Sequence, residues 1–320
     1  MRFKLFVGAL LILGIGCASG GSTPLPVAAD APAAEVALSD AVVMVAAGDI
    51  AVCSSNGDEA TAKLVEAVIK EDSAAGVETT VATMGDNAYP SGSEGPSYIF
   101  ERCWTPSWGS KTIMKVIRPS PGNHDFEVRR GKSYYAYFGD RAGPPGKGYY
   151  SYNFGQWHVV SLNSELAVDL ATAAEAREQE LWLIKDLKEN SKLCTMAYFH
   201  EPLFSSGDFH GNTPEIASLW MILFDAGVDL VLSGHEHHYE RFFPQTPTGV
   251  PDSLTGIEEI ITGTGGAGLR GVVDPPAPNS AVTIHGHWGI LKLTLGAKEY
   301  RHAFLDTNGR VWDRGGRKCH

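Results

Sequence analysis

The chain has 320 residues, 43% of them hydrophobic and 20% charged, with a formal net charge of −11. These values are ordinary for a globular protein and allow one substantial core. The negative charge gives no general electrostatic basis for binding nucleic acid, so we expect no nucleic-acid partner.

The first residues have the pattern of an export signal. Two basic residues precede an apolar run from Leu5 to Ile15, which is typical of a secretory signal and too short to span a bilayer comfortably. The stretch ending at Cys17 resembles a bacterial lipoprotein signal, in which the Cys is lipidated after cleavage, although Gly14 replaces a larger aliphatic residue. A plain signal cut later, near Ala34, is the alternative, and both interpretations predict export.

Residues 18–40 are rich in Ala, Pro, Gly and Ser and are expected to form a flexible tether. The predicted organisation is an export signal over residues 1–17, a tether over 18–40 and a single domain over 41–320. Removal of residues 1–16 takes away two basic residues and no acidic one, so the charge changes from −11 to −13. We expect a periplasmic or cell-surface lipoprotein, or a secreted protein, linked to a membrane only through a lipid at Cys17.

The number of cysteines also bears on the cellular compartment of the protein. If Cys17 carries lipid, four cysteines remain, and in an exported protein these suggest two disulfides. None has the Cys-x-x-Cys spacing of a zinc ribbon. Of the three pairings that four thiols allow, we expect Cys53–Cys103 and Cys194–Cys319, each tying a loop or tail to the scaffold.

The first half of the chain alternates between strands and helices. Asp58 is a plausible N-cap of the first helix, whose apolar residues recur at helical spacing. The predicted elements are a strand, a helix, a strand, a short helix and a strand, over residues 41–47, 58–71, 79–84, 96–104 and 113–118. This alternation favours a largely parallel sheet with helices on its faces, and therefore an α/β fold.

The second half begins with a hairpin over residues 149–163 that turns at Gly155-Gln156. Leu183, Ile184 and Leu187 fall on one face of the longest predicted helix. The remaining elements are helices over residues 173–190 and 214–226, and strands over 194–199, 228–232, 257–262, 290–295 and 299–305. The end of the chain is thus more purely β than its beginning.

Polar residues follow the carboxyl ends of several predicted strands, where ligands bind in open α/β sheets. These residues are Asp49, Asp86, Asn123, His200 and His235. The first three are spaced 37 residues apart, about one strand–helix–strand unit, so each unit returns the chain to the same edge. The Asp86 carboxylate can bridge two metal ions, and Tyr89 can bring a phenolate to one of them. We therefore predict one dinuclear metal site.

The donor types also indicate the chemistry. Carboxylate and phenolate oxygens suit a trivalent or otherwise hard ion, whereas His and Asn suit a divalent one. A metal-bound water has a pKa lowered to about 7 or below, which supplies a hydroxide nucleophile without a protein base. Two cations also neutralise the charge that builds on a phosphate during an in-line displacement.

These stretches resemble the motif blocks of the calcineurin-like metallophosphoesterase superfamily, and most closely those of its purple acid phosphatase branch. The blocks stand in the family's order: Gly48-Asp49, Gly85-Asp86-Asn87-Ala88-Tyr89, Gly122-Asn123-His124-Asp125, Ala197-Tyr198-Phe199-His200 and Gly234-His235-Glu236-His237. In the first block Ala51 stands where the wider superfamily has a His ligand, and Tyr89 is the natural replacement.

The resemblance implies a four-layer fold, a two-sheet β-sandwich flanked by helices, and a ligand set. The first metal, ferric iron, would be held by Asp49, Asp86, Tyr89 and His237. The second, a divalent iron, zinc or manganese ion, would be held by Asp86, Asn123, His200 and His235. His124 would contact the phosphate and protonate the leaving group, and His210 is a second candidate for this role.

The predicted function is hydrolysis of small phosphate esters, chiefly phosphomonoesters, by a metal-bound hydroxide. Two alternatives stay open: a phosphodiesterase or nucleotidase with the same site, and a surface protein that holds metals without turnover. Tyr89 could instead pack or cap a strand end, as tyrosines there often do. The run from Gly263 to Gly268 lacks the Lys-Ser/Thr ending of a phosphate-binding P-loop and is expected to be a tight return near the site.

Overall fold

The structure is a computed structural model that describes residues 40–90, 98–126, 130–169 and 172–320. The predicted export signal, Cys17 and nearly all of the predicted tether therefore lie outside the described residues. The predicted helix over 96–104 is also described only from residue 98 onward, and its last five residues form a π-helix, Phe100–Trp104.

The first of two large sheets collects strands from both ends of the domain. Its strands are β1 (Val42–Ala47), β3 (Thr79–Met84), β5 (Ile117–Ser120), β13 (Gly289–Leu295), β14 (Glu299–Asp306) and β15 (Val311–Lys318). Their order is β15-β14-β13-β1-β3-β5. The strands β1, β3 and β5 are parallel, whereas β13 pairs antiparallel with β1. The prediction of a largely parallel sheet thus holds for the early strands, and the last strands extend the sheet with antiparallel pairs.

The second sheet is built from the middle of the chain. Its strands are β6 (Tyr150–Phe154), β7 (Trp157–Ser161), β8 (Cys194–Tyr198), β9 (Leu230–Ser233), β10 (Tyr239–Phe242), β11 (Glu258–Thr262) and β12 (Ser280–Ile284). Their order is β12-β10-β11-β9-β8-β7-β6, and β6 pairs with β7 as the predicted antiparallel hairpin. A two-stranded pair, β2 (Ala51–Val52) and β4 (Ala88–Tyr89), lies beside the motif residues.

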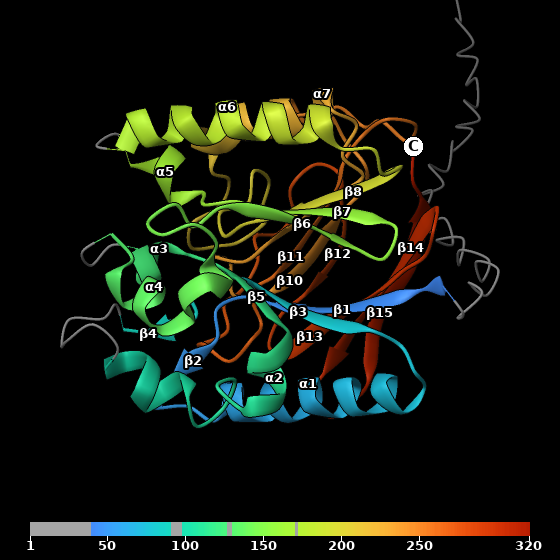
Figure 1. Ribbon diagram of the computed structural model, residues 1–320. Coiled ribbons are helices and arrows are strands. Elements are labelled where there is room, and N and C mark those ends of the chain that lie inside the picture. The colour runs from blue at the N-terminus through green and yellow to red at the C-terminus, as the bar shows by residue number, and fades with distance from the viewer. Residues whose placement is uncertain (1–39, 91–97, 127–129, 170–171) are drawn as a thin grey trace, which may run out of the picture. The chain divides into compact units, whose positions relative to one another are not determined.

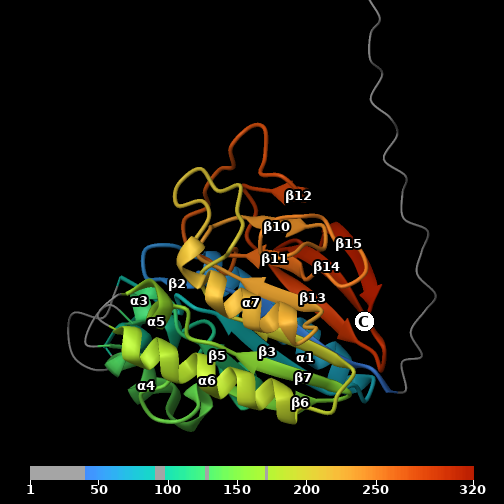
Figure 2. The same cartoon turned by 90° about the horizontal axis from the view of Figure 1, so that it is seen from above.

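Helices cover the outer faces of both sheets, which makes the four-layer α/β sandwich that the sequence predicts (Figure 1). Two helices, α1 (Gly57–Ala74) and α2 (Lys111–Val116), lie against the first sheet. Two others, α6 (Ala173–Glu189) and α7 (Ala217–Asp225), lie across the second sheet, whose edge strands β6 and β12 stand at opposite ends (Figure 2). The short helices are α3 (Asn123–Phe126), α4 (Lys132–Phe138), η3 (Gly139–Ala142), α5 (Glu165–Val168) and η5 (Pro214–Ile216).

Both faces of the central strands are buried, which explains why their sequences are largely apolar. Successive side chains of a strand point to opposite faces, and both faces of these sheets are covered. In β1, Met44 packs between the sheets with Trp157 and Met196, whereas Val45 packs outward with Val65 of α1. Hydrophobic burial on both sides therefore fixes the strands that carry the motif residues.

Several local predictions are wrong in informative ways. Residues 113–116 belong to helix α2, because the Ser110 side chain caps that helix by accepting a hydrogen bond from Ile113 N. Asp58 is not an N-cap: helix α1 begins at Gly57, and the Asp58 carboxylate accepts a hydrogen bond from Ser107 instead. On α6, Leu183 is buried, but Ile184 is 45% exposed.

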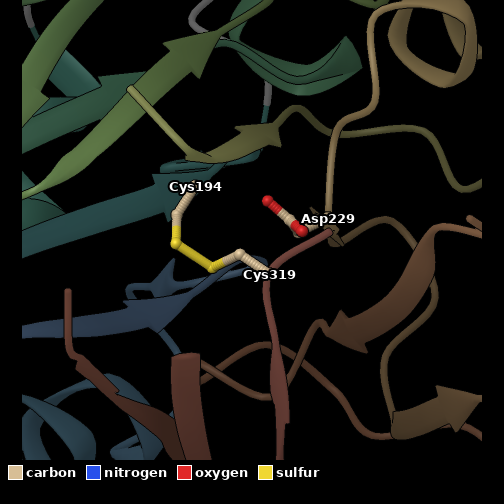
Figure 3. A group of neighbouring side chains, drawn as sticks. All are labelled: Cys194, Asp229 and Cys319. Carbon is tan, nitrogen blue, oxygen red and sulfur yellow. A yellow bond between two sulfur atoms is a disulfide. The ribbon is translucent and has the colours of Figure 1, made fainter. Parts of the chain in front are cut away.

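Both predicted disulfides, Cys53–Cys103 and Cys194–Cys319, are present. The second joins the start of β8 to the residue after β15, and so ties one sheet to the other (Figure 3). Beside it, the Asp229 carboxylate accepts hydrogen bonds from Thr195 N and His320 N, both at 2.9 Å. None of the helices in the described ranges has both the length and the apolar run that a bilayer span requires.

Candidate metal centre

The motif residues meet where the two sheets present the carboxyl ends of their parallel strands. Asp49 follows β1, Asp86 follows β3 and Asn123 follows β5 in the first sheet; His200 follows β8 and His235 follows β9 in the second. Backbone hydrogen bonds join these loops, from Asp49 N to Gly85 O at 3.1 Å and from Gly234 N to His200 O at 2.9 Å. The predicted donors from distant parts of the chain are thus brought to one place.

One group of donors gathers around Asp49. The Tyr89 hydroxyl donates a hydrogen bond to Asp49 Oδ1 at 2.8 Å. His237 Nε2 lies 3.2 Å from the same oxygen and 3.4 Å from the Tyr89 hydroxyl. These are the residues expected at the first metal, together with Asp86.

A second group gathers around His200. Its Nε2 lies 3.0 Å from Asn123 Oδ1, 3.5 Å from Asp86 Oδ1 and 3.1 Å from His235 Nδ1. Asp49, Asp86 and His200 offer donor atoms that all lie within 4.8 Å of one another. The two groups therefore adjoin at Asp86, the residue expected to bridge two ions, although its assignment as a ligand stays a prediction.

The tautomers implied by the hydrogen bonds fit bound cations. His200 Nδ1 faces Met84 O at 2.8 Å, and His237 Nδ1 faces Gly268 O at 2.5 Å. A nitrogen that faces a carbonyl carries the proton, so the other ring nitrogen of each His presents a lone pair. These lone pairs converge with the Asn123 and Asp86 oxygens, an arrangement that a cation stabilises.

The charge balance of the protein alone points the same way. Burial disfavours the imidazolium form of His200, but the negative charges of Asp86, Asp49 and two further carboxylates raise its pKa to about 10. Burial likewise opposes ionisation of Asp49, yet the charge of His237 and its hydrogen bond hold the pKa of Asp49 below its usual range. The same negative field that stabilises a proton on His200 would stabilise a metal ion.

Tyr89 depends most on such an ion. Burial and the nearby charges of Asp49 and Asp86 raise the pKa of Tyr89 well above its usual value, so the phenolate form is disfavoured by the protein itself. A cation in the site reverses this balance, because its charge outweighs those of the carboxylates. Ligation by a phenolate is therefore coupled to metal binding.

Three of the predicted ligands have a strained backbone. Asp49, Asp86 and His235 have φ values of 59°, 49° and 66°, in the left-handed region that costs energy for residues other than Gly. The close approach of the loops also excludes side chains at neighbouring positions. A Cβ on Gly122 would lie 2.4 Å from Asp86 Oδ1, and one on Gly234 would lie 2.7 Å from Asp49 Oδ2.

The two predicted catalytic histidines stand at the edge of the donors. His124 Nε2 lies 3.9 Å from Asp86 Oδ2, and the His124 side chain is 33% exposed. The His210 ring stacks on the His235 ring, with centroids 3.9 Å apart and planes 20° from parallel. Both histidines can therefore reach a molecule bound at the donors.

Sequence reasoning missed Arg270, which lies beside His210. Its Nη1 is 3.1 Å from His210 Nδ1, and its guanidinium lies 4.2 Å from the centre of the exposed Phe209 ring. Burial and the charge of Arg270 lower the pKa of His210 to about 4. In the sequence, Arg270 was marked only by the glycine-rich run that precedes it. The proximity of Arg270 to His210 arises from tertiary packing, which the sequence does not show.

Buried glutamates hold the loop that carries His210, and these residues were also missed. Backbone N–H groups of the loop donate to Glu259 (from Leu203 and Phe204), to Glu240 (from Ser206) and to Glu236 (from His210 and Gly211). Another glutamate, Glu201, directly follows His200 and lies 3.3 Å from His235 Nε2. Its position next to a motif His was the available sequence signal.

The fold and these donors define an α/β protein whose strand-end site is suited to bind metal cations. The chain belongs to the calcineurin-like phosphoesterase family, whose sequence profile matches residues 40–239. The resemblance to the purple acid phosphatase branch is confirmed by relatives of that name. One is purple acid phosphatase 15 of Arabidopsis thaliana, 33% identical over 144 residues, which are 41% of this chain and 26% of that protein.

Solved structures share the fold. The purple acid phosphatase PPD1 from yellow lupin matches with a TM-score of 0.69 at 19% identity, over 87% of this chain and 54% of that one. Plasmodium GAP50, described as the anchor in the inner membrane complex, matches with a TM-score of 0.72 at 15% identity, over 88% and 89% of the two chains. The chain thus spans about a quarter of the Arabidopsis relative and about half of the lupin protein.

Proposed function

We propose that this protein is an exported, dinuclear-metal phosphatase that hydrolyses small phosphomonoesters. The observation that carries the proposal is the meeting of two groups of donors at Asp86, one around Asp49 and one around His200. A single ion would leave one group of buried donors without a cation, whereas two ions use both. Membership of a phosphoesterase family supports the reaction class.

Two ions account for every predicted ligand. Asp49, Asp86, Tyr89 and His237 would hold ferric iron, and Asp86, Asn123, His200 and His235 would hold a divalent iron, zinc or manganese ion. When bound, the ions supply positive charge to the phosphate oxygens and acidify a water molecule. The two disulfides support export, since such bonds persist in oxidising compartments, and a lipid at Cys17 would retain the protein at a membrane.

The chain's own residues orient the ester and move the proton. His124 Nε2 holds the proton that passes to the leaving oxygen when the bond between that oxygen and phosphorus breaks. Its distance of 3.9 Å from Asp86 Oδ2, the predicted bridge, supports this role. Arg270 contributes a fixed positive charge that can pair with phosphate oxygens. His210, the second candidate for proton transfer, stands between Arg270 and His235, and its lowered pKa restricts it to donating a proton in acid solution.

Hydrolysis of an aryl phosphate monoester, with the matching aryl diester as the second substrate, tests this function. The wild type should cleave the monoester faster, Asp86→Ala should lose metal and activity together, and His124→Ala should lose activity while it keeps both metals. Preference for the diester would replace the phosphatase by a phosphodiesterase. Equal inactivity of all three proteins, with two metals bound to the wild type, would refute catalysis.

That last outcome corresponds to a second candidate function, a metal-holding protein without turnover. The similarity in fold to Plasmodium GAP50, the anchor in the inner membrane complex, is the observation that favours it. The partly exposed position of His124 beside the predicted bridge favours the enzyme, because a purely structural site has no use for a reachable proton donor.

A further inference from the structure

The outward nitrogens of the three predicted histidine ligands have different partners. His200 and His237 face backbone carbonyls, those of Met84 and Gly268. His235 alone of the three faces a carboxylate, since its Nε2 lies 3.3 Å from Glu201 Oε2. The three rings are therefore not equivalent as donors. The ring that differs, His235, belongs to the second group of donors, around His200.

His200, Glu201 and His235 offer donor atoms within 4.8 Å of one another, but the orientation of His235 favours Glu201 as a partner of the ring. His235 Nδ1 lies 3.1 Å from His200 Nε2, on the side where the donors of the second group converge. Nε2, on the opposite side of the ring, faces Glu201. A carboxylate on Nε2 accepts the N–H there, which leaves the lone pair on Nδ1 free for a metal.

Glu201 is itself held in place. The residue is 4% exposed, and its Oε2 accepts a hydrogen bond from Thr213 Oγ1 at 2.9 Å. Its backbone N donates to Ser164 Oγ at 3.2 Å, and the Thr213 backbone N donates to Pro202 O at 3.1 Å. Hydrogen bonds to two other segments thus hold the carboxylate, so it can fix the angle of the His235 ring as well as its tautomer.

We infer that Glu201 is a positioning residue that orients and polarises His235, and thereby selectively strengthens binding of the second metal ion. A carboxylate hydrogen-bonded to a ligating imidazole raises the basicity of the ring, and loss of such a partner costs roughly 10- to 100-fold in metal affinity. The first metal shares Asp86 but not His235, so its affinity is expected to change little. The inference deepens the proposed function and rests on its two-metal site.

The test compares metal affinities of full-length Glu201→Ala, Glu201→Gln and wild-type protein by equilibrium dialysis with elemental analysis, using Zn²⁺ for the second site after the first is filled with iron. Glu201→Ala should bind Zn²⁺ roughly 10- to 100-fold more weakly. Glu201→Gln, which keeps an oxygen that can accept the N–H but loses the charge, should lie between Glu201→Ala and the wild type. Iron binding should stay within about 2-fold of the wild type in both variants.

Glu165→Gln is the matched control. Glu165 is also a buried carboxyl near His200 and Glu201, and it accepts a hydrogen bond from Ser164 Oγ at 3.1 Å. If Glu165→Gln weakens Zn²⁺ binding as much as Glu201→Gln, general negative charge explains the affinity and the positioning role is refuted. Equal loss of iron and Zn²⁺, or a lowered melting temperature of the metal-free Glu201 variants, would show a structural role instead.

Co²⁺ in place of Zn²⁺ distinguishes a positioning residue from a direct ligand. At saturation, Glu201→Ala should keep the visible Co²⁺ spectrum of the wild type, because the atoms bound to the ion are unchanged; an altered spectrum would make Glu201 a ligand and refute the inference. Two metals bound equally well by the wild type and both variants would also refute it while leaving the proposed function intact. Failure of the wild type to bind a second ion would refute the two-metal function itself.

Discussion

Gly122→Ala should disable the centre without removing any donor. The added Cβ would lie 2.4 Å from Asp86 Oδ1, 2.4 Å from Asp86 N and 2.8 Å from His200 Cγ. An ordinary contact is about 3.5 Å, so the Asp86 loop or the Gly122 backbone must move by about 1 Å. Asp86 is the residue expected to touch both ions, so this shift acts on the whole centre.

The expected loss can be estimated from that displacement. A misplacement of 1 Å in an active site can cost about 100-fold in rate, which corresponds to about 2.7 kcal/mol of activation free energy. Overpacking should also lower the free energy of unfolding by about 1–3 kcal/mol. Steady-state hydrolysis of an aryl phosphate, with elemental analysis of bound metal, measures the first effect, and thermal unfolding measures the second.

Gly268→Ala is the control for this substitution. The Gly268 carbonyl faces His237 in the site, but an added Cβ at Gly268 meets no atom within 4 Å. The kcat of Gly268→Ala should therefore stay within about 3-fold of the wild-type value, because no donor is displaced. If folded Gly122→Ala keeps wild-type kcat and both metals, close packing around Asp86 does not position the ions, and the reasoning is wrong.

Three further predictions follow from other contacts of the described residues. Tyr89→Phe should abolish a visible phenolate-to-iron band in the iron-loaded protein; a band that survives would reject Tyr89 as a ligand. Arg270→Ala should raise KM for a phosphate monoester by about 10-fold or more with a smaller change in kcat, because a charge-assisted contact is worth about 1.5–3 kcal/mol; an unchanged KM would remove Arg270 from the substrate site. Asp313→Asn should lower the free energy of unfolding at pH 7 by about 3–5 kcal/mol, since Asp313 Oδ2 accepts a hydrogen bond from Arg241 Nε at 2.8 Å and joins β15 to β10.

The Asp313 prediction has a defined pH dependence. Burial opposes ionisation of Asp313, but nearby His302, whose Nε2 lies 3.5 Å from Oδ2, and the hydrogen bonds from Arg241 hold the pKa of Asp313 below its usual range. A lowered folded-state pKa contributes stability above the unfolded-state pKa of about 3.9, and this contribution is lost as the pH falls below that value. The difference between wild type and Asp313→Asn in urea unfolding should therefore shrink below about pH 4; a constant difference would point to packing.

The strands and the motif residues were predictable because their signals are local. The run that became β1 is apolar throughout, and the run that became β3 combines threonines with apolar residues, a composition that favours strands. A Gly-Asp pair follows each of them, so strand and loop could be assigned from neighbouring residues. The hairpin of β6 and β7 carried its own turn signal. The convergence of Asp49, Asp86 and Asn123 could also be expected from the sequence. Their spacing matches the length of a strand–helix–strand unit, which returns the chain to the same edge of the sheet.

The errors occurred where nonlocal contacts outweigh local preference. Residues 113–116 are apolar and β-branched enough to suggest a strand, but the Ser110 cap and packing against the sheet make them helical. The strands β10, β12 and β15 were not predicted: β10 and β15 carry charged residues or Gly, and β12 is a short run of five residues. They form because a neighbouring strand supplies hydrogen bonds.

The sequence by itself determined the family, the α/β class, the candidate ligands and the four cysteines that pair, because each depends on residue type and spacing along the chain. Only the tertiary structure decided that Glu201 faces His235, that Arg270 lies beside His210, and that donors from two different sheets adjoin at Asp86. Each of these relations joins residues that are far apart in the chain. They depend on the order in which the strands pair and on the packing of one sheet against the other, which short-range patterns do not specify.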